Sequence, residues 1–137
     1  MRLQATCVAV GGRGLLIEGA PGSGKSSLAL ALLDRGAELV GDDGVDLTAD
    51  GGRLLASPVP AIAGLLEVRN VGLLTWPVAE RVPLALALRL DPAAERLPDG
   101  PETRELLGLS LPLFPLWPDS PVLALRALAA LSRFGLD

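Results

Sequence analysis

Short apolar runs separated by glycine turns, and one stretch of helix formers, make up the first third of the chain. Loose apolar alternation over residues 3–10 predicts a strand, and the glycines of 11–14 are typical of a hairpin leading into a second strand over 15–18. Residues 27–35 are rich in helix formers and stop before a glycine, which predicts a helix. Residues 38–41 then predict the next strand of a β-α-β unit, parallel to the strand at 15–18.

The middle of the chain adds strands and no helix to the predicted fold. Residues 45–48 and 53–56 flank an Asp-Gly-Gly turn and predict a second hairpin. Residues 82–90 are strongly apolar and predict a buried strand. Residues 91–101 are polar and contain prolines, so we expect an exposed loop there.

The last part of the chain predicts an irregular stretch followed by one helix. Prolines interrupt residues 111–121 repeatedly, which argues against regular structure there. Residues 122–134 fit a final helix. Together with the earlier elements, this pattern indicates an α/β fold with a central mixed sheet and few helices. The apolar residues expected on one face of the final helix are Val122, Leu125, Leu128 and Ala129.

A glycine-rich segment joins the strand predicted at 15–18 to the helix that follows it. The segment fits the pattern G-x-x-x-x-G-K-S/T at every fixed position, in the strand–loop–helix context that this pattern requires. Glycines let the backbone approach a polyphosphate, while the loop N–H groups and the helix N-terminus present oriented positive dipoles. A chance glycine turn is the alternative, and the predicted strand before the segment and helix after it argue against that alternative. The predicted nucleotide-binding residues are Gly19, Ala20, Pro21, Gly22, Ser23, Gly24, Lys25, Ser26 and Ser27.

Two side chains of this segment carry the predicted chemistry. Lys25 is the only lysine beside eleven arginines. Its compact ammonium suits the space near the β- and γ-phosphates, where a guanidinium fork is not equivalent. The Ser26 hydroxyl is the expected ligand of Mg²⁺. The sequence therefore predicts that the protein uses ATP and Mg²⁺.

A pair of acids, Asp42 and Asp43, follows the strand predicted at 38–41. The carboxyl ends of parallel strands in a doubly wound sheet share one crevice, so this pair is expected to face the γ-phosphate. A carboxylate there can hold Mg²⁺ or accept a proton from an attacking hydroxyl. If both residues are extended, their side chains point to opposite faces of the strand, so only one of the two acids is expected to hold Mg²⁺ or accept the proton. A solvated acidic turn is the alternative.

Composition narrows the classes of protein that remain. The 137 residues suit one domain, 1–137, and the net charge of −4 argues against a nucleic-acid partner. The absence of histidine excludes histidine catalysis and histidine metal sites, and the single cysteine, Cys7, excludes an internal disulfide. No apolar run reaches the roughly 18–20 residues that span a bilayer, and the N-terminus lacks the apolar core of a signal peptide. We therefore expect a cytoplasmic protein with no membrane partner.

Two segments resemble the bacterial HPr kinase/phosphorylase family. The run GAPGSGKSSLALALLDRGAELVGDDGVDL, residues 19–47, is similar to the glycine loop and acid pair of that family. Residues 64–73, GLLEVRNVGL, resemble its E-I-R-G-L-G signature. The likeness covers residues 3–75 well and the remainder poorly. It implies a P-loop-containing, kinase-type single domain, similar to compact alphaproteobacterial forms that lack a separate N-terminal domain.

The resemblance also implies roles for individual residues. It places Lys25 on the phosphates and Ser26 with Glu67 at the metal. It makes Asp43 the base that deprotonates the acceptor serine, and Asp42 an assisting residue. The implied activity is ATP-dependent phosphorylation of a serine on a small HPr-type phosphocarrier protein. Because the family is hexameric, a homo-oligomer is expected.

Three positions and one stretch depart from the family pattern. The family histidine before the glycine hairpin falls on Gln4, the acid that follows G-K-S falls on Ser27, and the first signature glycine falls on Asn70. The stretch 116–121 has no arginine, where full-length members carry an arginine-bearing loop. Because glutamine does not titrate near neutral pH, these departures predict a bias toward phosphorylation, with phosphorolysis doubtful.

Two other functions remain open at this point. A catalytically impaired nucleotide-binding regulatory protein fits the absent histidine and arginine. A small-molecule kinase would carry a lid with arginines, and Arg96 and Arg104 lie in a region that fits a loop. The intact acid pair and Glu67 favour the protein kinase.

Overall fold

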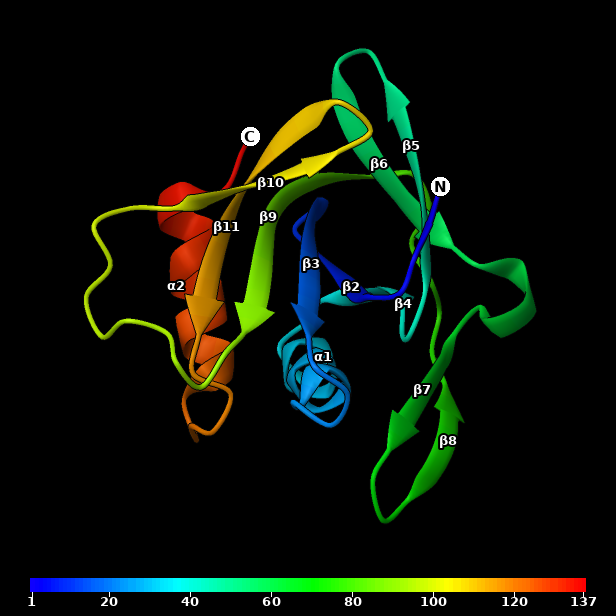
Figure 1. The fold of residues 1–137 in the computed structure, drawn as a ribbon. Helices are drawn as coiled ribbons and strands as arrows, with labels where there is room; N and C mark the ends of the chain where they lie inside the picture. Colours follow the sequence, from blue (N-terminus) through cyan, green and yellow to red (C-terminus); the bar gives the residue numbers. More distant parts are fainter.

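The computed structural model describes all 137 residues and is built on a mixed β-sheet with two α-helices (Figure 1). The main sheet has nine strands, in the order β1-β5-β6-β9-β3-β2-β4, with β11 beside β9 and β10 beside β11. The expected α/β fold with a mixed sheet and few helices is confirmed. The strands are β1 (Arg2–Leu3), β2 (Thr6–Val10), β3 (Arg13–Gly19), β4 (Glu38–Gly41), β5 (Val45–Asp50), β6 (Arg53–Pro58), β7 (Leu65–Val68), β8 (Gly72–Thr75), β9 (Val82–Leu90), β10 (Glu102–Leu106) and β11 (Leu109–Leu116); the helices are α1 (Lys25–Asp34) and α2 (Leu123–Phe134), and Pro60–Ile62 form one 3₁₀ turn.

Strand β9 is the centre of the sheet. It runs parallel to β3 and β11, and its first residues pair antiparallel with β6. Residues 84–88 are buried without a break, because both faces of the strand are covered. The two helices close one core over one face, while the strands β5, β6, β10 and β11 contribute to a second core that contains no helix residue. A continuous apolar run, rather than alternation, is what such a strand requires.

Strand β2 lies between β3 and β4 and runs antiparallel to both. The strands β3 and β4 therefore point the same way, as predicted, although they are not neighbours. Their carboxyl ends open at the same end of the sheet as the start of α1. This arrangement brings the glycine loop after β3 and the acid pair after β4 to one place.

The stretch 111–121, expected to be irregular, contains most of a regular strand, so that prediction is wrong. Strand β11 includes Pro112 and Pro115. Pro112 lies in the part of β11 that pairs with β10, and Pro115 lies in the part that pairs with β9. Each proline therefore has a partner strand on one side only, and the missing N–H is tolerated where a strand has an open side.

Helix α2 is present where the sequence predicts it, but it buries a different face. Val122 and Leu125 are 40% and 53% exposed. The polar residues Arg126, Ser132 and Arg133 lie on the side of the helix opposite the buried residues, so the sequence pattern does mark the buried face, and the expected face was assigned to the wrong side. The residues that it buries are Leu123, Ala124, Ala127, Ala130 and Leu131.

The strand expected over residues 3–10 is divided in two. Strand β1 ends at Leu3 and pairs with β5, while β2 begins at Thr6 and pairs with β3 and β4. Gln4 and Ala5 lie between them, where the chain passes from one partner to the other. This break brings Gln4 beside the acid pair.

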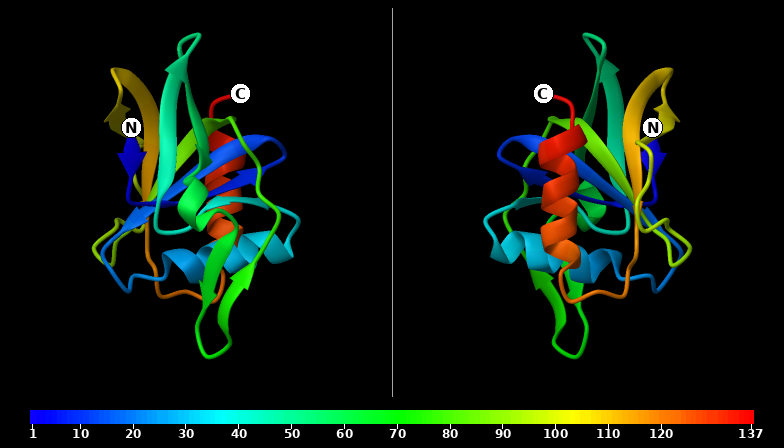
Figure 2. Two further views of the ribbon diagram at one scale, coloured as in Figure 1. Left: turned by 90° about the vertical axis from the view of Figure 1, so that its right-hand side faces the viewer. Right: turned by 90° about the vertical axis from the view of Figure 1, so that its left-hand side faces the viewer.

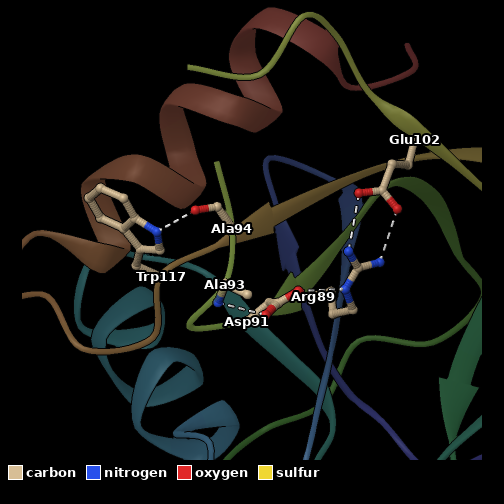
Figure 3. Close-up of polar contacts among 6 residues, drawn as sticks. All are labelled: Arg89, Asp91, Ala93, Ala94, Glu102 and Trp117. Carbon is tan, nitrogen blue, oxygen red and sulfur yellow. Dashed lines mark hydrogen bonds and ion pairs between the residues drawn. The ribbon is translucent and has the colours of Figure 1, made fainter. Parts of the chain in front are cut away.

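The loop 91–101 is exposed, as predicted, and is tied down at both ends (Figure 3). Arg89 of β9 donates to both oxygens of Glu102, each at 3.1 Å, and Glu102 raises the pKa of the guanidinium through this hydrogen bond. Asp91 accepts from the Ala93 N–H at 2.8 Å. The Trp117 indole Nε1–H donates to the Ala94 carbonyl oxygen at 2.6 Å. The loop and the segment after β11 therefore hold each other in place.

Candidate functional site

A polar pocket of about 450 Å³ lies where the glycine loop, the acid pair and the β7–β8 hairpin meet. None of its lining residues is hydrophobic. The hairpin projects from the body of the molecule beside α1 (Figures 1 and 2) and is anchored by Leu66, which is fully buried in the helix-containing core. The lining residues are Thr6, Pro21, Gly22, Gly24, Lys25, Ser26, Ser27, Asp42, Asp43, Glu67 and Arg69.

The three glycines of the loop are required for two different reasons. Gly22 and Gly24 have φ values of 78° and 104°, in the left-handed region that favours glycine, and a Cβ at either position would meet no atom within 4 Å. Gly19 has no such φ; a Cβ there would lie 2.6 Å from the Ser23 Oγ and 3.2 Å from Leu90. Glycine is therefore needed at position 19 for space rather than for a left-handed backbone.

The start of α1 is open to an anion. Gly24 is the N-cap residue, no side chain caps the helix, and the first turn contains no acid. The first backbone N–H groups of an α-helix have no partner within the helix, and together with the helix dipole they attract negative charge. Lys25 lies at this end, and its Nζ donates to the carbonyl oxygens of Gly19 at 2.8 Å and Ala20 at 3.2 Å. An ammonium has three N–H donors, so one remains beyond these two contacts.

Asp42 joins the acid pair to the glycine loop. Ser26 Oγ lies 2.8 Å and 2.9 Å from the two Asp42 carboxylate oxygens and donates to that carboxylate. The Thr6 Oγ1 donates to Asp42 Oδ1 at 2.9 Å from strand β2. Thr6 received no role from the sequence, where the only signal was a polar residue within the apolar pattern 3–10; the structure buries it fully. Three strands or helices, β2, β4 and α1, are thereby fixed to one carboxylate.

Asp43 has a separate environment at the mouth of the pocket. Its φ is 61°, in the left-handed region, so the backbone is not extended after Asp42. Both acids consequently line the pocket, as expected of the pair, and the extended backbone that would turn them to opposite faces is not present. Asp43 is exposed and accepts from the Gln4 Nε2 at 3.3 Å. The structure therefore brings together the two positions, 4 and 43, that the family resemblance links in catalysis.

The β7–β8 hairpin brings two charged side chains to the opposite wall. Glu67 and Arg69 are exposed and line the pocket at the end of β7. Asn70, in the turn, has a φ of 70°, and asparagine is among the non-glycine residues best able to adopt it. This explains how Asn70 occupies a position where the family signature carries glycine. Arg69 received no role from the sequence, yet it supplies positive charge beside three carboxylates.

The donor set fits a nucleotide polyphosphate with Mg²⁺. The open space over Gly22 and Gly24 leaves room for phosphate oxygens against the loop backbone. The Ser26 hydroxyl and the nearby carboxylates are hard oxygen donors of the kind that Mg²⁺ prefers. No group of three or more Asp, Glu, His or Cys side chains forms a closed cage. Nucleotide-bound Mg²⁺ needs none, because phosphate oxygens and water fill most of its positions.

The two arginines considered as lid residues lie away from this pocket. Arg104 belongs to β10 and donates to both oxygens of Glu18, at 2.9 Å and 3.0 Å, which raises the pKa of the guanidinium. Arg96 lines a different hollow, formed by the loop 91–101 and the end of β11. The structure therefore gives no support to a small-molecule kinase with an arginine lid.

Neither helix is long and apolar enough to cross a membrane.

The fold and the site define the class of protein. A glycine loop between a parallel strand and a helix, with a lysine and serine at the helix start and an acid hydrogen-bonded to that serine, is typical of α/β proteins that bind nucleotide phosphates. The model of one family, described as the HPr Serine kinase C-terminal domain, matches residues 1–79. The chain belongs to this family.

Individual relatives agree with the family model. An HPr kinase/phosphorylase of Xylella fastidiosa is 38% identical over 136 residues, covering 88% of this chain. One of Clostridium tetani is 45% identical over 76 residues, covering 56% of this chain. The chain spans 42% and 25% of the lengths of these two relatives.

A solved structure extends the likeness beyond the residues that the family model matches. The Hpr(Ser) kinase/phosphatase from Coxiella burnetii superposes with a TM-score of 0.84, at 27% identity, over 96% of this chain and 94% of that chain. The second half of the chain, where the resemblance in sequence is poor, therefore shares its fold with this structure.

Proposed function

We propose that this protein is an ATP-dependent protein serine kinase that phosphorylates a small HPr-type phosphocarrier protein. Membership of the family and the names of its relatives support this proposal. The observation that carries it is the hydrogen bond from Ser26 to Asp42, which joins the phosphate-binding loop to the acid pair in one polar pocket.

The nucleotide would occupy the glycine loop and the start of α1. In this proposal the backbone N–H groups of the loop 19–27 other than Pro21, which has none, hold the phosphates, and Lys25 moves its Nζ from the loop carbonyls to the β- and γ-phosphates. Ser26 and Glu67 would hold Mg²⁺, and because the Ser26 hydroxyl donates its hydrogen bond to Asp42, its oxygen lone pairs would remain free for the metal. When bound, Mg²⁺ neutralises charge on the β- and γ-phosphate oxygens.

Asp43 would act as the catalytic base and Asp42 would assist. Asp42 is half-buried and occupied by Thr6 and Ser26, whereas Asp43 is exposed where an acceptor protein can reach it. The acceptor serine oxygen attacks the γ-phosphorus, its proton passes to Asp43, and ADP leaves with the electrons of the broken bond. Positioning and electrostatics supply most of the catalysis in this class of reaction.

A second function is favoured by one specific contact. Gln4 holds Asp43 through a neutral amide, where the family resemblance places a histidine that can change charge. A nucleotide-binding regulatory protein with impaired catalysis is the function that this contact favours. Such a protein binds the nucleotide in the same pocket but transfers no phosphoryl group.

The two functions are separated by one experiment. The protein is incubated with γ-labelled ATP, Mg²⁺ and an HPr-type phosphocarrier protein, and the label is traced to serine by phosphopeptide mapping. The kinase transfers label, and Asp43→Asn lowers the rate of transfer by about 10²–10⁴ while Asp50→Asn, at an exposed acid in the β5–β6 hairpin, leaves it unchanged. ATP binding without any transfer establishes the regulator, and absence of ATP binding refutes both.

Residues 1–137 are proposed to act as one domain that assembles into a homo-oligomer in the cytoplasm. Light scattering at several protein concentrations tests the assembly, and a mass that remains that of one chain contradicts it.

A further inference from the structure

A second, smaller hollow of about 200 Å³ lies on the other side of the start of α1. One wall is α1 itself, and the other is the segment that leads from β11 into α2. This segment passes the same end of the molecule as α1 (Figures 1 and 2). The lining residues are Gly24, Ser27, Leu28, Ala31, Arg35, Pro118, Ser120, Pro121, Leu123 and Ala124.

This hollow borders the phosphate pocket. Gly24 and Ser27 line both of them. Ser26 and the acids lie on one side of these residues, and the small hollow lies on the other. A nucleotide whose terminal phosphate faces Asp42 and Asp43 therefore extends past Ser27 and directs its opposite end, the nucleoside, into the small hollow.

The chemistry of the lining suits a flat, mostly apolar ring with polar edges. Leu28, Ala31 and the prolines give apolar contact, and the Arg35 guanidinium lies at the end of α1. Arg35 donates from Nη1 to the Ala31 carbonyl at 3.0 Å, which keeps the plane of the guanidinium close to the hollow. A guanidinium stacks on aromatic faces and donates to ring nitrogens or carbonyl oxygens. No carboxylate lines the hollow, so no acidic acceptor distinguishes guanine from adenine there.

The wall formed by residues 117–121 is held in place without a ligand. Trp117 donates to Ala94 at 2.6 Å (Figure 3), and the Arg126 guanidinium carbon lies 5.7 Å from the centre of the indole ring. The Asp91 N–H donates to the Leu116 carbonyl at 2.9 Å. The Val122 N–H donates to the Ser120 Oγ at 3.2 Å, so the Ser120 hydroxyl proton is available to a ligand. Preformed walls lower the ordering cost of binding.

We propose that this hollow is the nucleoside subsite, which takes the purine base and ribose of the nucleotide. The inference rests on the proposed function, because the phosphates must first occupy the glycine loop. The base is held by apolar packing and by Arg35, with little discrimination between adenine and guanine. Residues 117–121 thus contribute to nucleotide binding.

The experiment compares a nucleotide with its phosphate part alone. Affinities of ADP, GDP and inorganic pyrophosphate are measured with Mg²⁺ by calorimetry. We expect both nucleotides to bind at least about tenfold tighter than pyrophosphate, and within about threefold of each other. Equal affinity for ADP and pyrophosphate overturns the subsite. Absence of binding by all three refutes the proposed function, and the subsite with it.

Two variants test the location. Ala31→Leu fills the hollow from α1, and Ala129→Leu adds the same atoms on the exposed side of α2. We expect Ala31→Leu to lower the affinity for ADP about fivefold or more and to leave the affinity for pyrophosphate unchanged, whereas Ala129→Leu changes neither affinity. An equal effect of Ala31→Leu on both ligands, or on neither, contradicts the proposal.

A second pair covers the case in which Ala31→Leu disturbs folding. Arg35→Ala removes an exposed side chain of the hollow, and Arg133→Ala removes an exposed arginine near the end of α2. Arg35→Ala is expected to lower the affinity for ADP about threefold to tenfold and to leave the affinity for pyrophosphate unchanged. If Arg35→Ala and Arg133→Ala behave alike toward ADP, Arg35 does not contact the base and the subsite is refuted.

Discussion

Replacing Thr6 by valine removes one of the two hydroxyls that hold Asp42. The change is nearly isosteric, and Thr6 is fully buried in β2, where valine is well accommodated. A hydrogen bond to a charged group contributes about 1.5–3 kcal/mol. Asp42 keeps Ser26 and is only half-buried, so water offsets part of the loss. We therefore expect the free energy of unfolding to fall by about 1–2 kcal/mol.

The assay for Thr6→Val is urea unfolding with a parallel thermal melt. For a chain of this size a loss of 1–2 kcal/mol lowers Tm by about 3–8 °C. Thr48→Val is the matched control, because Thr48 is an exposed threonine of β5. Its effect is expected to stay within about 0.5 kcal/mol. Equal stabilities of the Thr6→Val and Thr48→Val variants would refute the reasoning.

A double-mutant cycle separates the hydrogen bond from packing. Thr6→Val is measured again in an Asp42→Asn background, where the charged acceptor is gone. If the carboxylate is the source of the effect, the two changes couple by about 1 kcal/mol. A coupling energy of zero assigns the cost of Thr6→Val to packing in β2 and contradicts the role of Asp42 as an anchor.

Three further predictions concern the acid pair, Gln4 and the buried Cys7. Asp43→Asn is expected to keep nucleotide affinity within a few-fold while the transfer rate falls by about 10²–10⁴; if Asp42→Asn has that phenotype and Asp43→Asn does not, the assignment of the base is wrong. Gln4→His restores a titratable partner 3.3 Å from Asp43, so in a weakened kinase it raises turnover and introduces a pH dependence between pH 5 and 8; efficient phosphorolysis by the unmodified protein would show that this histidine is dispensable. Burial raises the pKa of the Cys7 thiol to about 12, so the thiol is protonated at pH 8 and is expected to resist iodoacetamide until urea unfolds the chain; alkylation of the folded protein contradicts this.

The glycine loop was predictable from sequence because its determinants are local. The pattern at 19–26 predicts both the turn and the helix that follows it, and in the structure α1 begins at Lys25. The meeting of the loop with the acid pair was also predictable, since β3 and β4 point the same way. The environments of the two acids were not, because the left-handed φ of Asp43 and the contacts of Asp42 depend on β1, β2 and α1 together.

The parts of the fold that sequence analysis missed depend on distant pairing. Strand β11 pairs with β9, about 25 residues earlier, and local proline content does not reveal that pairing. The buried face of α2 is a different case, because its polar residues Arg126, Ser132 and Arg133 mark the opposite side of the helix and the prediction grouped the wrong apolar residues. The Thr6 hydroxyl was overlooked because its acceptor lies 36 residues away.

Binding of ATP to the glycine loop is the claim on which the other proposals depend. Calorimetric titration of ATP with Mg²⁺ into the unmodified protein, Lys25→Ala and Lys25→Arg tests it directly, with a thermal melt to establish that each variant is folded. We expect one bound nucleotide per chain and a loss of affinity of about tenfold to a hundredfold in Lys25→Ala, because one charge-assisted contact to the phosphates is removed. Lys25→Arg is expected to recover only part of that loss, since the guanidinium does not fit the same space. Unchanged affinity in a folded Lys25→Ala variant would contradict the account.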